Sequence, residues 1–533
     1  MRDFQMPGRS PVHALNAMAA TSQPAATLAA IEILRAGGNA IDAAVAAAAV
    51  LAVVEPGSTG IGGDCFVLHA PAGGDEIIAY NGSGRAPGAA EAAWFVERGI
   101  DAIDETSAHA VTVPGAVDAW DRLIADHGRK GLDAALRPAI ALAEEGYAVH
   151  PRCAYDWAKA ADKLRADPGA AALFLPGGAP PASGDVHRQP ALAATLRRIA
   201  AEGRAGFYAG PVAEEIVETL RARGGLHRLD DFAAAEGEYV APIKTRYRGL
   251  DIHECPPNGQ GIVALIMLNI LEGHALGAAA PLDDPLGAAR LHLEVEAGRI
   301  AYADRDALLA DPRMAAVPVA EMLSPAHAAE ARARIRPDRA MDDVPAPNFP
   351  AHEDTVYLCV VDPDGNAVSF INSVFHGFGS GIAAPRSGVL LQNRGAGFVV
   401  RPGHPNCIAP GKRPMHTIIP GMASENGRVV MPFGVMGGQY QPFGHVHFIT
   451  NLVDYGMDVQ AALDCPRVFR YGETLEVERG VPEASLRALA ERGHRVVRAE
   501  DPLGGGQAIR IDHERGVLIG GSDPRKDGCA LGF

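Results

Sequence analysis

Residues 353–375 read EDTVYLCVVDPDGNAVSFINSVF, and they carry the strongest structural signal in the chain. Residues 355–361 are apolar and rich in β-branched side chains, as in a buried strand. Residues 362–366, DPDGN, form a strong turn signal. Residues 367–375 have the composition of a second strand. The pattern predicts a β-hairpin whose first strand starts at Thr355.

The segment before this hairpin has a different composition. Residues 341–354 read MDDVPAPNFPAHED, with three prolines and several acids. Such a composition disfavours helix and strand, so we expect an exposed linker. Its end, between Asp354 and Thr355, is a candidate cleavage site.

Cleavage at this point would make Thr355 a chain terminus. A threonine hydroxyl is a poor nucleophile unless a base takes its proton, and a terminal α-amino group can do so. Its pKa of about 7.7–8.0 suits neutral pH. The same hydroxyl could first attack the carbonyl of Asp354 and form an ester that water hydrolyses. The alternative is a threonine that is merely favoured at a strand start.

Bulk composition excludes several classes of protein. The chain has 533 residues, 48% of them hydrophobic and 21% charged, so it is globular and too long for one compact core. The net charge of −16 disfavours binding to nucleic acid or anionic membranes. The longest apolar run, residues 43–54, is shorter than a transmembrane span. No secretory signal is evident, so we expect a cytoplasmic protein.

Helices are expected through most of the first two thirds of the chain. Asn39 is a candidate N-cap of an Ala-rich helix that ends at Glu55. A Gly-rich turn and a strand over 65–69 follow. Further helices are expected over 119–127, 192–202, 212–223, 287–305 and 445–465.

Rival chemical signatures are missing from the sequence. It has no G-x-S-x-G elbow, Walker A motif, G-x-G-x-x-G after a strand, or H-E-x-x-H. His445 and His447 could ligate a metal, but residues at i and i+2 face different sides of a helix. We therefore expect neither a metal nor a cofactor.

Many short phrases, in order along the chain, resemble the γ-glutamyltransferase family. Their combination is specific, although each alone is weak. They are ATSQP from residue 20, EILRAGGNAIDAA from 32, GIGG from 60, VPG from 113, GFY from 206, PPNGQG from 256, YADR from 302 and SDPRKDG from 522.

The resemblance implies an α+β fold, the four-layer αββα sandwich of N-terminal-nucleophile hydrolases. It implies a proenzyme that splits into a large subunit, 1–354, and a small subunit, 355–533, which stay together as a heterodimer; a dimer of such heterodimers is left open. Thr355 matches the family's nucleophile, and Ser373 the hydroxyl beside the nucleophile's amine. Gly437 and Gly438 match the glycine pair whose N–H groups hold the oxyanion.

The substrate-binding positions depart from the glutamyl-binding pattern. Phe375, Arg394 and Gly397 stand where that pattern has Asn, Gln or Glu, and Asp, and His416-Thr417 replaces a serine pair. The carboxylate-binding arginine falls at Ser83, with Arg85 two residues later. Losing acids that hold an ammonium and gaining arginine favours an acid without an amino group. The alternative for Arg394 and Arg413 is solvation at the surface.

Three functions follow in order of preference. The first is an amidohydrolase for a small carboxylate-bearing amide, since LQNRG from residue 391 and PGKRPMHT from residue 410 resemble a side branch that includes oxamate amidohydrolases. The second is true γ-glutamyl transfer from glutathione. The third is an uncleaved, non-catalytic binding protein with the same fold.

Overall fold

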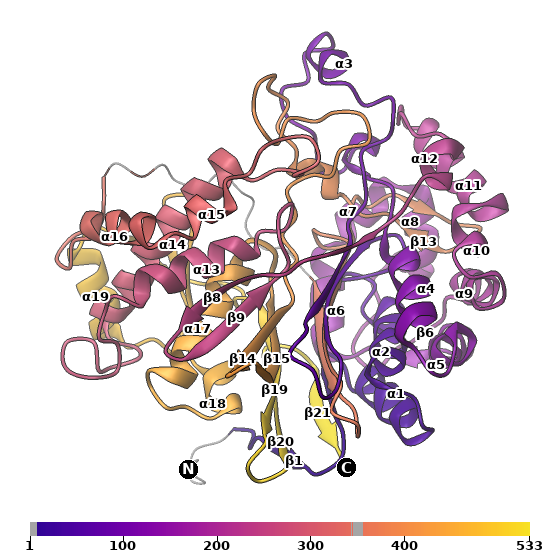
Figure 1. Cartoon of the computed structure of the whole chain (residues 1–533). Coiled ribbons are helices and arrows are strands. Elements are labelled where there is room, and N and C mark those ends of the chain that lie inside the picture. The colour runs from indigo at the N-terminus through magenta and orange to yellow at the C-terminus, as the bar shows by residue number, and fades with distance from the viewer. Residues whose placement is uncertain (1–7, 343, 345–354) are drawn as a thin grey trace.

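The computed structural model describes residues 8–342, 344 and 355–533. Two seven-stranded sheets lie face to face at its centre, with helices on both outer sides (Figure 1). The chain therefore forms the expected four-layer αββα sandwich. Of the linker predicted over 341–354, the structure describes residues 341, 342 and 344; Met341 and Val344 are buried, so the expected exposure is wrong there because both pack against the hydrophobic core. The other linker residues, Asp354 among them, lie outside the described residues.

The first sheet, called the β10 sheet, contains the hairpin predicted from the sequence. Its strands, in spatial order, are β21 (Cys529–Gly532), β2 (Met18–Thr21), β10 (Val356–Val361), β11 (Ala367–Ser373), β3 (Asp64–Ala70), β4 (Ile78–Gly82) and β7 (Glu238–Val240). β10 and β11 pair antiparallel with Val356 opposite Asn372. Because β10 is central, the residue that precedes it lies deep in the molecule.

The second sheet, called the β15 sheet, packs against the first. Its strands are β1 (Val12–Ala14), β20 (Val517–Ser522), β19 (Gly505–Asp512), β15 (Arg428–Met436), β14 (Gly421–Glu425), β9 (Leu250–Glu254) and β8 (Ile243–Tyr247). Apolar side chains from both sheets form the core between them, among them Phe66, Tyr357, Ile371, Met422, Met436 and Ile509. Alternation along each strand supplies these inward-facing residues.

Helices cover the outer face of the β10 sheet. They are α1 (Pro24–Arg35), α2 (Ala40–Val54), α4 (Ala116–His127), α5 (Leu132–Glu145), α6 (Pro151–Lys159), α7 (Ala161–Ala166), α8 (Pro168–Phe174), α9 (Pro190–Glu202), α10 (Ala205–Tyr208), α11 (Gly210–Arg221) and α12 (Leu229–Ala233). The predicted cap is confirmed: Asn39 accepts from the N–H groups of Ile41 and Asp42. α2 is buried along its whole length, which explains its apolar sequence.

A second helical layer covers the β15 sheet. It contains α13 (Gly261–Leu271), α14 (Ala288–Leu308), α15 (Val319–Met322), α16 (Pro325–Arg334), α17 (Gln441–Val453), α18 (Val459–Asp464) and α19 (Glu483–Glu491). The single helix expected over 445–465 is wrong, because Gly456 turns the chain with φ +64° and Asp458 caps a new helix by accepting from Ala461 N–H.

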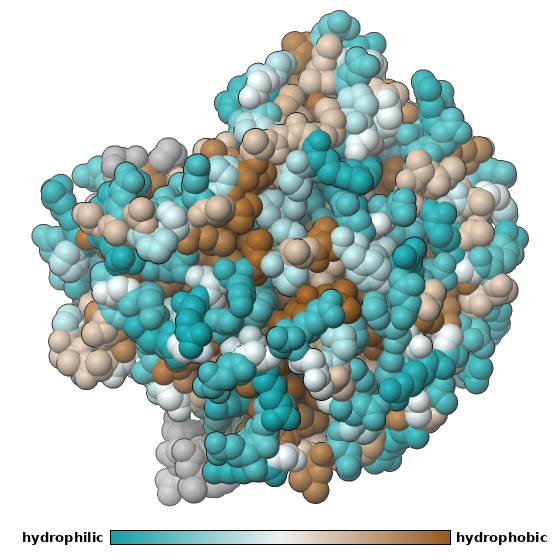
Figure 2. Space-filling model, viewed as in Figure 1, coloured by the Kyte–Doolittle hydropathy of each residue, from teal (hydrophilic) through white to brown (hydrophobic). Residues whose placement is uncertain are grey.

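Smaller elements complete the chain. They are α3 (Ala92–Val96), the pairs β5 (Tyr147–Ala148) with β6 (Val186–His187) and β12 (Ala383–Ala384) with β13 (Val389–Leu390), and the sheet of β16 (Val468–Tyr471), β17 (Thr474–Val477) and β18 (Arg495–Arg498). The face shown in Figure 2 is mostly polar, with hydrophobic residues in small separate areas. Among the described residues, no helix combines the length and the apolar content that spanning a bilayer requires.

Candidate active site

The hairpin brings Thr355 and Ser373 together. Thr355 immediately precedes β10, and Ser373 ends β11, directly opposite it in the register. Their side-chain oxygens are 3.2 Å apart, and both residues are fully buried. Ser373 thus lies beside Thr355, with the contact made between the two hydroxyls, because the turn at 362–366 fixes the register of the two strands.

A buried arginine reaches the same serine. Arg394 starts a short 3-10 turn, η3 (Arg394–Gly397), and is fully buried. Its Nη1 donates to Thr417 Oγ1 at 2.5 Å and its Nη2 to Ser373 Oγ at 3.3 Å. The guanidinium carbon lies 4.0 Å from the centre of the Phe375 ring. Surface solvation is thus excluded for Arg394, and a desolvated cation lies next to the candidate nucleophile.

The glycine pair lies where β15 ends. Gly437 and Gly438 have φ values of +118° and +52°, which favour glycine. The Gly437 carbonyl accepts from Tyr440 N–H at 2.9 Å, and Gln260 Nε2 donates to the Gly438 carbonyl at 3.0 Å. Since a peptide group is planar, fixing the Gly437 carbonyl also orients the Gly438 N–H, and fixing the Gly438 carbonyl orients the Gln439 N–H.

Helix α17 begins directly after this turn. Its first residue, Gln441, is fully buried, and its Nε2 lies 3.5 Å from Thr355 Oγ1. Gln441 Oε1 accepts from Ile419 N–H at 3.0 Å, which orients the amide. The positive end of the helix dipole therefore lies on the same side as the glycine pair, where negative charge would be stabilised.

The side chain of Arg85, another predicted binding residue, contacts acids and not Ser373. Arg85 lies 3.5 Å from Asp311 and 3.8 Å from Glu238. Burial, followed by the charge of the nearby Arg413, lowers the pKa of Arg85 to about 10. Arg413 is itself buried and bonded to Glu238 and to the Ser83 carbonyl, so surface solvation is excluded for it too.

His416 is also fully buried. Its Nε2 lies 2.9 Å from Asp64 Oδ2 in β3, and the ring packs on Phe66. Burial, followed by the charge of Arg394, lowers its pKa to about 4, so the ring is neutral at neutral pH. Of the predicted binding residues, the structure gathers Phe375, Arg394 and Thr417 around Ser373, whereas the side chains of Arg85 and His416 bond to acids.

A cavity of about 630 Å³ adjoins this group. Its lining includes Phe375, His376, Gly397, Met415, Gln439 and Arg305. Arg305 bonds to Gln260 and Gln439, so a network runs from the cavity wall to the glycine turn. No role was predicted for Gln260, Gln441 or Arg305. Gln260 lies in the phrase PPNGQG and Arg305 in the phrase YADR, whereas Gln441 is revealed only by its contact with a residue distant in sequence.

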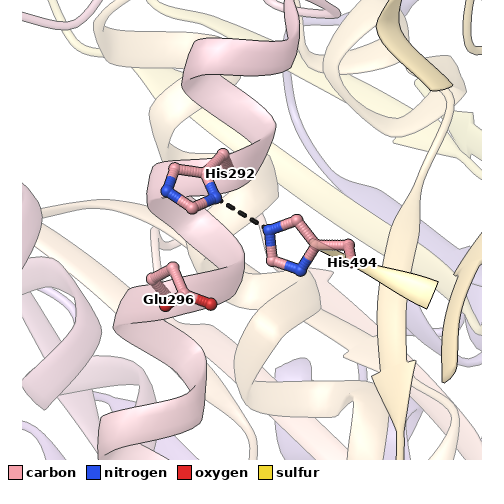
Figure 3. A group of neighbouring side chains, drawn as sticks. All are labelled: His292, Glu296 and His494. Atoms are coloured by element: carbon pink, nitrogen blue, oxygen red, sulfur yellow. Dashed lines mark hydrogen bonds between the residues drawn. The ribbon is translucent and has the colours of Figure 1, made fainter. Parts of the chain in front are cut away.

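One buried group among the described residues has the composition of a metal site. His292 and Glu296 of α14 meet His494, and Figure 3 shows the His292 ring pointing at that of His494. Their facing nitrogens are 2.7 Å apart, while the other nitrogen of His292 bonds the Arg336 carbonyl at 2.7 Å. Burial lowers the pKa of His494 to about 3.

The surroundings of this group oppose a divalent cation. Glu296 accepts from Arg299 at 2.9 Å and from Met341 N–H at 2.7 Å. The charges of Arg470, Arg299 and Arg492 also lower the pKa of His494. The group is better explained as a hydrogen-bonded anchor for residues 336–341.

His445 and His447 bond different acids, Glu254 at 2.7 Å and Glu294 at 3.1 Å.

These features define the class of protein. Two stacked antiparallel sheets between helical layers, with a buried threonine at the head of a central strand and a glycine turn beside it, are the architecture of N-terminal-nucleophile hydrolases. Residues 26–533 match the family model described as gamma-glutamyltranspeptidase. The chain belongs to the gamma-glutamyltranspeptidase family, and it is an enzyme of the hydrolase or acyltransferase type.

Individual relatives cover nearly the whole chain. The crystal structure of cephalosporin acylase from Bacillus halodurans matches with a TM-score of 0.92 and 40% identity, over 100% of this chain and 99% of that one. The glutathione hydrolase-like YwrD proenzyme of Bacillus subtilis is 38% identical over 94% of this chain and 95% of its own length. The oxamate amidohydrolase proenzyme of Klebsiella pneumoniae is 36% identical over 97% and 98%.

Proposed function

We propose that the chain is a self-processing amidohydrolase whose nucleophile is Thr355. In maturation the Thr355 hydroxyl attacks the Asp354 carbonyl carbon, the carbon–nitrogen bond breaks, and the nitrogen takes the hydroxyl proton. Water then hydrolyses the ester to give fragments 1–354 and 355–533, which remain a heterodimer. The proenzyme names of the relatives support this order of events.

In turnover the freed amine of Thr355 takes the hydroxyl proton as the oxygen attacks the substrate amide. The same proton passes to the leaving nitrogen, and water later hydrolyses the acyl-enzyme. Gly437 and Gly438 supply N–H groups to the oxyanion, a task worth about 10²–10³ in rate for each donor. Ser373 orients the nucleophile from 3.2 Å.

One observation carries the substrate assignment: the buried Arg394 bonds the same hydroxyl, Ser373, that contacts Thr355. A guanidinium in a dry site binds carboxylate strongly. Because a single side chain separates this cation from the nucleophile, a carboxylate close to the scissile amide fits best. Oxamate, whose carboxylate adjoins its amide, has this form.

The volume of the cavity favours a second candidate. At about 630 Å³ it exceeds what a molecule as small as oxamate fills, and it falls within the range of drug-sized ligand sites. An acylase that removes a larger acyl group is therefore the second proposal, supported by the cephalosporin acylase relative. γ-Glutamyl transfer ranks third, because a cation stands at Arg394 where that pattern has Gln or Glu.

A substrate panel tests the ranking. Purified enzyme is assayed on oxamate, glutaryl-4-nitroanilide and γ-glutamyl-4-nitroanilide, with glycylglycine as acceptor in a parallel series. Turnover of oxamate or of the glutaryl amide supports the first or second proposal. Turnover of the γ-glutamyl compound alone rejects both. A single uncleaved species without activity supports the non-catalytic alternative.

A further inference from the structure

Glu105 connects a surface segment to the strand end beside the candidate nucleophile. It lies between α3 and the short turn η1 (Ala108–Ala110), and its side chain is 39% exposed. Its Oε2 is 2.7 Å from His376 Nδ1, and its Oε1 is 3.3 Å from Lys163 Nζ. Lys163 also donates to the carbonyls of Gly377 and Gly379, both at 3.1 Å. The chain that follows Phe375 is thus held by these two side chains.

Asn393 ties the same segment to the residue before Arg394. Its Nδ2 donates to the Glu105 carbonyl at 3.1 Å, and its Oδ1 accepts from His376 N–H at 3.1 Å. Glu105 therefore contacts both stretches of chain that flank the guanidinium: the one that carries Phe375 and the one that carries Arg394.

His376, Phe375 and Arg394 form a stack of three planar groups. The His376 and Phe375 rings are stacked at 4.0 Å with 24° between their planes. Arg394 lies over the Phe375 ring, also at 4.0 Å. Two groups at this distance cannot share one face of a ring, so Phe375 is held between an imidazole and a guanidinium.

The backbone at Phe375 needs such support. Its φ is +83°, a conformation that costs an ordinary residue about 1–3 kcal/mol and persists only where surrounding contacts impose it. Phe375 N–H donates to Ser373 Oγ at 2.8 Å, so a shift of Phe375 would also disturb the serine beside Thr355. His376, the next residue, is fixed from outside by Glu105.

We propose that Glu105 is a specificity-determining positioning residue, which acts through His376 and Phe375 to set the place of the Arg394 guanidinium. The inference rests on the proposed function, because it assumes that Arg394 binds the substrate carboxylate. Hydrogen bonding from His376, with a smaller effect of Lys163, lowers the pKa of Glu105 to about 2, so its charge persists at all working pH values. Loss of the contact between Glu105 and His376 frees the stack of His376, Phe375 and Arg394. Carboxylate binding then weakens, whereas the chemical step is affected much less.

The test compares E105A, E105Q and the control E97A, whose carboxylate lies in the same region and is 74% exposed. Each variant is assayed on oxamate and on its neutral analogue, oxamide. If the wild type prefers glutaryl-4-nitroanilide, that compound and its terminal amide are used as the charged and neutral pair. For E105A we expect normal self-cleavage, a KM about tenfold higher for the carboxylate, kcat within about threefold, and an unchanged KM for the neutral analogue. E105Q, which still offers an oxygen to His376, should fall in between.

Each other outcome has a definite meaning. A wild type that does not favour the carboxylate over its neutral analogue rejects the proposed function itself. If the wild type favours the carboxylate and the E105A variant favours it equally, only the role of Glu105 is rejected and the proposed function stands. Equal rises in KM for both compounds, or a fall in kcat only, also reject it. If E105A fails to fold or to cleave itself, E105Q with its melting temperature decides the question.

Discussion

Arg394 Nη2 and Thr355 Oγ1 both contact one atom, Ser373 Oγ, at 3.3 Å and 3.2 Å. A group suited to bind a carboxylate and a group suited to attack an amide are thus joined through one hydroxyl. The relationship links the proposed carboxylate-binding group to the proposed nucleophile, because moving Ser373 or Arg394 would disturb both.

Thr355→Ala should abolish cleavage and activity together, since the proposed mechanism assigns both steps to one hydroxyl. A denaturing gel should show a single 55.6 kDa chain, whereas the wild type gives two fragments, the smaller one starting at residue 355 by N-terminal sequencing. Thr355→Ser should restore cleavage, and Thr474→Ala, on a distant strand, should behave as wild type. An active enzyme with an intact bond before residue 355 would reject the mechanism.

Arg394→Lys should raise KM for the carboxylate substrate about 10²–10³-fold, because an ammonium cannot bond Ser373, Thr417 and a carboxylate as a planar guanidinium does. The variant's melting temperature checks its folding. Arg85→Ala tests whether that arginine shares the task; its contacts with Asp311 and Glu238 predict a change below about threefold. A larger effect at Arg85 than at Arg394 would reverse the assignment.

Gln260→Ala should lower kcat about tenfold and leave KM nearly unchanged. The Gln260 amide holds the carbonyls of Gly438 at 3.0 Å and Thr417 at 2.8 Å, so its loss loosens the oxyanion turn. Gln189→Ala is a matched control, since Gln189 is buried and donates to the Val53 carbonyl far from the site. Equal falls in kcat for both variants would indicate a general loss of stability.

Acid should destabilise the protein through its buried neutral histidines. The pKa of His494 is lowered to about 3 in the folded state, against about 6.5 when unfolded, so the unfolded state binds more protons between these values. The resulting contribution to the free energy of unfolding is complete above pH 6.5 and is lost as the pH falls toward 3. The loss is at most about 1.4 kcal/mol for each pH unit. In His494→Leu, the free energy of unfolding measured with urea should change less between pH 7 and pH 4 than in the wild type.

The same group of residues allows a test for metal. Because Glu296 already accepts from Arg299 and Met341, treatment with a chelator should change the melting temperature by less than about 2 °C. Added zinc should not raise it. Stabilisation by zinc that disappears in His494→Leu would show that the group holds a metal ion after all.

The hairpin could be predicted from local sequence signals. The β-branched run after Thr355 and the turn at 362–366 are local signals, and together they fix the strand register that brings Ser373 to Thr355. The order of short motifs also determined the four-layer fold. The split between α17 and α18 was missed, because an apolar helical pattern continued across Gly456, where a left-handed turn interrupts it.

The arrangement of the candidate substrate-binding residues could be seen only in the folded chain. From sequence, Arg85, His416 and Arg394 were equal candidates; folding turns the first two toward acids and the third toward Ser373. The phrase PPNGQG marked Gln260 without indicating its role, and Glu105 carried no readable signal, since each contacts residues more than a hundred positions away. Local patterns encode strands and turns, whereas the partner of a buried polar side chain depends on which distant segments the packed layers bring beside it.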